Sequence, residues 1–238
     1  MIKQSIADYL NDLRAGGFES NRTFVFIDTC SLLDLIRDRK NLDKNNITMF
    51  QNYNELLQRS LRNEIFLVSS YMVLVELHSN FSNIKKECID KYNEIINKIT
   101  ALQNLAIHYR KIKRGARYDS RFNPLSEAEY LYNELIKKIV FLEEKIEYDQ
   151  FAMFRVEQKL PPAHKKHEYK DAFIWGTCLD FKTHIVPPDR ILFFTTNTED
   201  YTIKTDHPEF AALNAQLTID QEGKVEIVTN INHLIHLL

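Results

Sequence analysis

Short apolar runs, too short to form helices, recur along this chain and are separated by segments with helical spacing. They are rich in β-branched and aromatic residues and cover 23–27, 65–68, 191–194 and 225–228. Runs of this kind are typical of strands buried on both faces of a parallel sheet, and each parallel connection needs a crossover that is usually a helix. The sequence therefore predicts an α/β fold with an open parallel sheet of about four to five strands flanked by helices.

Helical spacing accounts for most of the remaining chain. Apolar residues recur every three or four positions over 2–13 and predict a first helix, which a glycine pair ends. Two long charged helical patterns cover 84–108 and 126–157 and show little strand character. We interpret the region 80–160 as a helical insertion that adds no strand to the sheet, within a single domain that covers residues 1–238.

Charge and cysteine content restrict the classes of function. The chain carries 31 Lys and Arg against 33 Asp and Glu, a net charge of -2. It therefore lacks the global basic field of a nucleic-acid coat protein, and any phosphate partner must be held locally. Its 3 cysteines are far apart and form no CxxC pair, which favours reduced thiols and a cytoplasmic location. No run reaches the roughly 18 apolar residues that a membrane span needs.

Four acidic residues stand at the ends of apolar runs or within apolar helical segments: Asp28, Glu76, Asp171 and Asp200. A buried carboxylate is costly to desolvate unless a cation or a hydrogen bond compensates it. In an open parallel sheet the carboxyl ends of the strands meet at one edge, and a shared site there would bring the four acids together. Oxygen ligands of this kind suit Mg²⁺ or Mn²⁺, which phosphodiester hydrolysis uses to orient water and neutralise charge.

Each acid also has a structural interpretation. Asp28 after a strand and Asp171 at a helix start occupy positions where turn and capping residues are common. Glu76 can pair with a Lys or Arg at the rim of the fold, and Asn197 with Asp200 can form an Asx turn. The order of the acids and their strand context favour a shared metal site over four separate structural roles.

The segments that carry these acids resemble the motifs of the PIN-domain nucleases, which are metal-dependent ribonucleases with a compact parallel sheet. The similar segments are the opening strand Phe26-Ile27-Asp28-Thr29, the second acid Glu76, the helix start Lys170-Asp171-Ala172 and the closing motif Thr195-Thr196-Asn197-Thr198-Glu199-Asp200. The resemblance implies a metal-binding and catalytic set of Asp28, Glu76, Asp171 and Asp200. It further implies supporting roles for Thr29, Thr195 and Asn197.

The resemblance covers roughly 22–82 and 160–230. About 95 residues separate Glu76 from Asp171, where a minimal PIN domain is expected to have a much shorter link. The chain therefore resembles a larger bacterial PIN-like branch with inserted helices.

Basic residues near these motifs are candidates for contacts with a phosphate backbone. Five are interpreted as substrate-binding: Lys165, Lys166, Lys170, Arg114 and Arg117. The three lysines lie next to Asp171, and the two arginines lie in a basic segment over 111–121 that predicts a loop. A charge run in a loop is also typical of a solvated surface.

Together the motifs predict a Mg²⁺- or Mn²⁺-dependent endoribonuclease that leaves a 5′-phosphate and a 3′-hydroxyl, as the resemblance implies. RNA is the expected partner, and single-stranded DNA is the alternative substrate of a structure-specific DNA nuclease. A toxin or phage-defence effector and a housekeeping RNA-processing enzyme are both compatible settings, and a homodimer or a regulatory protein partner is left open. The alternative from a different class is a non-catalytic PIN-like module whose insertion binds a partner protein.

Overall fold

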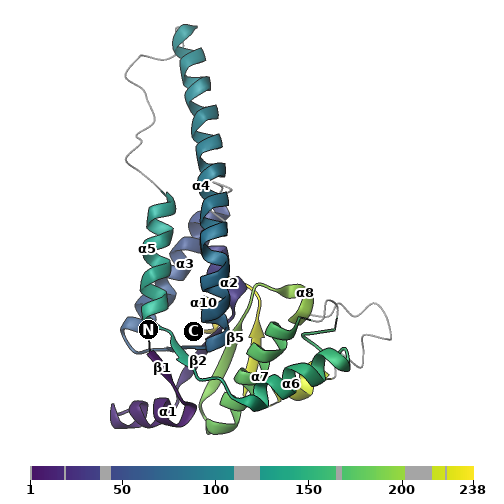
Figure 1. The fold of residues 1–238 in the computed structure, drawn as a ribbon. Helices are drawn as coiled ribbons and strands as arrows, with labels where there is room; N and C mark the ends of the chain where they lie inside the picture. The colour runs from purple at the N-terminus through teal and green to yellow at the C-terminus, as the bar shows by residue number, and fades with distance from the viewer. Residues whose placement is uncertain are drawn as a thin grey trace.

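A computed structural model describes residues 2–18, 20–37, 44–109, 124–164, 168–201, 216–222 and 224–238. The six strands of its sheet are β1 (Ile2–Gln4), β2 (Thr23–Ile27), β3 (Phe66–Ser70), β4 (Val140–Leu142), β5 (Arg190–Phe194) and β6 (Val225–Val228). They form one open sheet in the order β1-β4-β3-β2-β5-β6 (Figure 1). Every neighbouring pair is parallel, as predicted for the class of fold.

Helices connect these strands, as parallel pairing requires. They are α1 (Ile6–Ala15), α2 (Thr29–Arg37), α3 (Lys44–Leu61), α4 (Tyr71–His108), α5 (Pro124–Lys138), α6 (Ile146–Glu157), α7 (Tyr169–His184), α8 (Thr198–Tyr201) and α10 (Ile231–Leu237). A further helical stretch covers 216–221. Within the described ranges, none of the helices combines the length and the apolar character needed to cross a membrane.

Two neighbouring residues of β5 show how both faces of the sheet are covered. Because successive side chains of a strand point to opposite faces, Phe193 and Phe194 enter different layers. Phe193 lies edge-on to Trp175 of α7, with ring centroids 4.9 Å apart. Phe194 packs against Tyr53 of α3 at 6.1 Å. All four side chains are buried, so the apolar run is the centre of a sheet with helices on both sides.

Two strands at one side of the sheet were not predicted. Ile2–Gln4 is a strand, and the first helix begins only at Ile6, where the N-cap Ser5 accepts a hydrogen bond from the Asp8 backbone N–H. Val140–Leu142, inside the second long helical pattern, forms β4 and pairs with both β1 and β3. The prediction that the insertion adds no strand was therefore wrong. The strand escaped recognition in the sequence because three residues are too few to interrupt a helical periodicity.

The helix α4 is longer than the sequence pattern indicated. Ser70 is the N-cap of this helix, and its hydroxyl accepts a hydrogen bond from the Met72 N–H at 3.3 Å. The helix then runs through 38 residues to His108, so the helical pattern predicted over 84–108 is the second part of one continuous helix. Its first part lies against the sheet and α2, and the rest projects away from the sheet (Figure 1).

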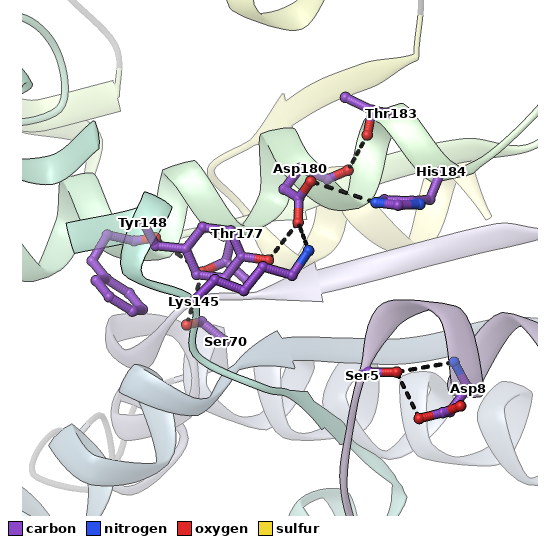
Figure 2. Close-up of polar contacts among 10 residues, drawn as sticks. Ser5, Asp8, Ser70, Lys145, Tyr148, Thr177, Asp180, Thr183 and His184 are labelled. Carbon is purple, nitrogen blue, oxygen red and sulfur yellow. Dashed lines mark hydrogen bonds and ion pairs between the residues drawn. The ribbon is translucent and has the colours of Figure 1, made fainter. Parts of the chain in front are cut away.

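Polar contacts fix α6 and α7 against the end of β3 (Figure 2). The hydroxyl oxygens of Ser70 and Thr177 share a hydrogen bond of 3.1 Å, which joins β3 to α7. Farther along α7, Asp180 accepts hydrogen bonds from Lys145 at 2.6 Å and from Tyr148 at 2.5 Å. These contacts set the position of α7 relative to the start of α4, and both helices carry acids of the predicted site.

Candidate active site

The carboxyl ends of β2, β3 and β5 lie next to one another, because β2 is paired in parallel with both neighbours. Asp28 directly follows β2, and Glu76 lies near the start of α4, which begins where β3 ends. Asp200 lies in the short α8 just after β5, and Asp171 stands in the first turn of α7. The fold therefore carries all four predicted acids to the same edge of the sheet.

Asp28 is deeply buried, with 1% of its surface exposed. Its Oδ1 accepts a hydrogen bond from the Thr29 backbone N–H at 2.7 Å, and its Oδ2 accepts one from the Thr195 hydroxyl at 2.7 Å. Burial raises the pKa of Asp28 to about 6; the bond from Thr195 opposes this shift, and the charge of Glu76 adds to it. Two hydrogen-bond donors thus hold the carboxyl group in place, but they do not fully offset the cost of burying its anionic form.

Glu76 is joined to the same strand end through Thr29, whose hydroxyl donates to Glu76 Oε2 at 2.6 Å. The other carboxylate oxygen, Oε1, lies 3.3 Å from the ammonium nitrogen of Lys170. Thr29 therefore lies between two acids, since its backbone N–H binds Asp28 and its hydroxyl binds Glu76.

Asn197 links the other two acids. Its side-chain nitrogen donates to Asp171 Oδ2 at 3.1 Å and to Asp200 Oδ2 at 2.8 Å. Its backbone N–H donates to the hydroxyl of Thr195, the residue that also binds Asp28. Burial, followed by the charges of the neighbouring acids, raises the pKa of Asp171 to about 8. The acids are thus close enough to act on one another electrostatically.

A cleft of about 490 Å³ opens beside this cluster. Glu76, Asp171 and Asp200 line it, whereas Asp28 is too deeply buried to form part of its wall. The wall also contains charged and polar residues that were not predicted to have a role in the site: Asp34, Arg37, Asn80, Glu168, Thr196 and Glu199.

Asp34 belongs to the cleft although no motif marks it. Its Oδ2 accepts a hydrogen bond from the Thr196 hydroxyl at 2.5 Å, and its charge adds to the raised pKa of Asp28, after the larger effect of burial. Asp34 and Arg37 follow Cys30 at positions i+4 and i+7, so these three side chains share the face of α2 that lines the cleft. This helical spacing after the first acid was the signal in the sequence.

The side-chain atoms available as metal ligands in the cleft are of the kind that a hard cation binds. They are carboxylate oxygens, and burial, together with the charges of neighbouring acids, raises the pKa of both Asp28 and Asp171. Among the described residues, no three His, Cys, Asp or Glu side chains are already arranged to hold a metal ion. The acids instead contact hydrogen-bond donors of the protein itself. Glu76, Asp171 and Asp200 would have to give up these contacts to bind an ion.

A family model of the PIN domain matches residues 25–201. The chain belongs to the PIN-domain family. The matched range of this PIN domain begins in β2 and ends with α8, so it contains all four acids. It also includes the region 80–160, which we had interpreted as lying outside the resemblance. Comparisons with curated proteins and with solved structures found no match.

PIN domains are generally nucleases, and a nuclease must hold a phosphate backbone near its acids. Of the five basic residues predicted to do so in this PIN domain, Lys170 lies within the described ranges, where it pairs with Glu76. The others lie outside them, as does the predicted loop over 111–121: Lys165, Lys166, Arg114 and Arg117.

Proposed function

We propose that this PIN domain is an endoribonuclease that hydrolyses RNA phosphodiester bonds with the help of Mg²⁺ or Mn²⁺. The observation that carries the proposal is the gathering of Asp28, Glu76, Asp171 and Asp200 at one edge of the sheet, beside an open cleft. Burial and mutual repulsion raise the pKa of two of these acids. A bound cation stabilises such an arrangement of charge.

The acids and their neighbours have separate parts in the proposed reaction. Glu76, Asp171 and Asp200 line the cleft and would bind the ion, and Asp28 would complete the set. When bound, the ion would neutralise charge on the phosphate and lower the pKa of an attacking water. Asn197 keeps two of the carboxylates side by side, which limits the rearrangement that binding needs.

The choice of RNA over DNA follows the resemblance of the motifs to the PIN-domain ribonucleases. The acids would act on the phosphate, which both polymers share, so other residues of the cleft must distinguish the sugar. Asn80 lines the cleft and offers an amide group of the kind that contacts a 2′-hydroxyl. We therefore expect RNA to be cleaved faster than DNA of the same sequence.

Incubation with 5′-labelled single-stranded RNA and with matched DNA tests the proposal. We expect internal cleavage of RNA in Mn²⁺, none in EDTA, and labelled products that end in a 3′-hydroxyl. Asp28→Asn should lower the rate by orders of magnitude. Glu129→Gln is the matched control, because it removes an acid that pairs with Lys85 between α4 and α5 and does not line the cleft, so it should leave the rate unchanged.

The same experiment separates the alternatives. Cleavage of DNA but not RNA would favour a structure-specific DNA nuclease. Cleavage of neither polymer, with a folded protein and Mn²⁺ present, would favour a non-catalytic interaction module whose acids have structural roles.

A further inference from the structure

Among the described residues, Lys170 is the one that forms an ion pair with any of the four acids. Its ammonium nitrogen lies 3.3 Å from Glu76 Oε1. The residue stands in the first turn of α7, directly before Asp171. Its side chain is 50% exposed, whereas the side chain of Glu76 is 14% exposed. A flexible, half-exposed cation therefore contacts a largely buried acid of the cleft.

Within the described ranges, this ion pair is the one contact in which a positive charge compensates any of the four acids. Asp28, Asp171 and Asp200 receive hydrogen bonds from uncharged donors. Lys170 offsets part of the negative charge, but only at Glu76. A half-exposed ion pair is weak, because water screens it and the long side chain loses conformational freedom. A divalent ion with several carboxylate ligands would therefore displace it.

We propose that Lys170 is an exchangeable cation. Its ammonium group pairs with Glu76 in the metal-free protein, and a divalent ion displaces it. The released ammonium group then binds a phosphate of the substrate. This inference rests on the proposed function, because it assumes that the acids bind the ion used in RNA cleavage. It gives Lys170 a binding role with two opposite effects, since the same charge competes with the metal and attracts the RNA.

The charge of the cleft explains why a released cation matters to the substrate. Arg37 is the one basic side chain among the described residues of the wall. The acidic side chains of the wall are Asp34, Glu76, Glu168, Asp171, Glu199 and Asp200. An incoming phosphate would be repelled there until cations compensate the acids. The ammonium group of a lysine is a compact charge on a flexible stem, which suits a phosphate approaching from solvent.

Mn²⁺ binding to Lys170→Met, measured by isothermal titration calorimetry, tests the competition. Methionine keeps a long unbranched side chain but has no charge, so the ion no longer competes with an ammonium group for Glu76. We expect Mn²⁺ to bind about two- to fivefold more tightly than to the wild-type protein, the range that a partly exposed ion pair supports. Lys170→Arg retains the charge and should show no gain.

Lys85→Met is the matched control for the loss of one positive charge. Lys85 pairs with Glu129 at 2.6 Å, and its side chain is 40% exposed, which resembles the exposure of Lys170. Neither Lys85 nor Glu129 lines the cleft. The substitution should therefore leave Mn²⁺ affinity unchanged, and a gain equal to that of Lys170→Met would overturn the proposal in favour of a general charge effect.

RNA binding at several salt concentrations tests the phosphate contact. Ca²⁺ can replace Mn²⁺ here because it binds the same kind of oxygen ligands, and gel electrophoresis verifies that the RNA stays intact. In Ca²⁺, Lys170→Met should weaken binding and reduce the slope of log affinity against log salt by about 0.7, the contribution of one phosphate contact in a single strand. In EDTA, where Lys170 stays on Glu76, the slope should not change.

The outcomes distinguish this inference from the proposed function. Equal or weaker Mn²⁺ binding by Lys170→Met would overturn the competition, and an unchanged slope in Ca²⁺ would overturn the phosphate contact. Absence of Mn²⁺ binding by the wild-type protein would instead refute the proposed function, and this inference with it.

Discussion

Replacing Asp28 by Asn removes a buried charge while it keeps the shape of the side chain. The amide oxygen can accept the Thr29 N–H, and the amide nitrogen can donate to the Thr195 hydroxyl, so both hydrogen bonds of Asp28 have counterparts. The substitution therefore isolates the electrostatic cost of the carboxylate. In EDTA we expect Asp28→Asn to stabilise the folded protein at alkaline pH.

The sign follows from the pKa of Asp28, which burial raises from its ordinary value of 3.8 to about 6 in the folded protein. Folding then favours the protonated acid, so the cost of Asp28 to stability is absent below about pH 4, grows between pH 4 and 6, and is complete above pH 6. At about 1.4 kcal/mol per pKa unit, the full cost is about 3 kcal/mol. A domain of this size gains about 2 to 4 °C in Tm per kcal/mol, so the variant should melt about 6 to 12 °C higher at pH 8.

Thermal melts followed by circular dichroism at pH 4 and pH 8 in EDTA measure this effect. The gap in Tm between Asp28→Asn and the wild type should be small at pH 4 and large at pH 8, and Glu129→Gln should show no such dependence. Mn²⁺ at pH 8 should narrow the gap, because the ion stabilises the wild type more than the variant. A variant that is less stable than the wild type at pH 8 in EDTA would refute the electrostatic reasoning and favour a structural turn role.

Two further substitutions test the positioning of the acids and the frame of the sheet. Asn197→Ala removes the hydrogen-bond donor that Asp171 and Asp200 share, so urea unfolding in EDTA should show a free energy of unfolding lower by about 1 to 2 kcal/mol. An equal loss in Mn²⁺ would contradict the view that an ion takes over the role of this donor. Asp189→Asn breaks the buried ion pair with Arg22, so unfolding should show a loss of about 3 to 5 kcal/mol. The protein that stays folded should cleave RNA at the wild-type rate, and a selective loss of activity would show that this pair does more than stabilise the fold.

The central strands were predictable because a strand buried on both faces must be apolar throughout. The runs that form β2, β3 and β5 therefore stand out from the helical patterns around them, whereas β6 lies at the edge of the sheet and was recognisable from its β-branched residues. Asp28 was recognisable for the same reason, since a carboxylate that closes such a run needs compensation.

The strands β1 and β4 and several contacts of the cleft depend on tertiary packing that a local pattern does not encode. The strands β1 and β4 have three residues each, and their pairing joins the segment Ile2–Gln4 to Val140–Leu142, which lies far away in the sequence. The contact of Lys170 with Glu76 depends on how α7 lies against α4, which Ser70 and Thr177 help to fix. Asp34 reaches the cleft through the orientation of α2.

Anomalous X-ray diffraction from crystals of the protein soaked in Mn²⁺ tests the central claim most directly. We predict a Mn²⁺ peak in the cleft, with carboxylate oxygens of Glu76, Asp171 and Asp200 about 2.0 to 2.6 Å away and the ammonium group of Lys170 withdrawn from Glu76. A well-ordered cleft without a peak at saturating Mn²⁺, or a peak bound by other residues while the present hydrogen bonds of the acids persist, would contradict it.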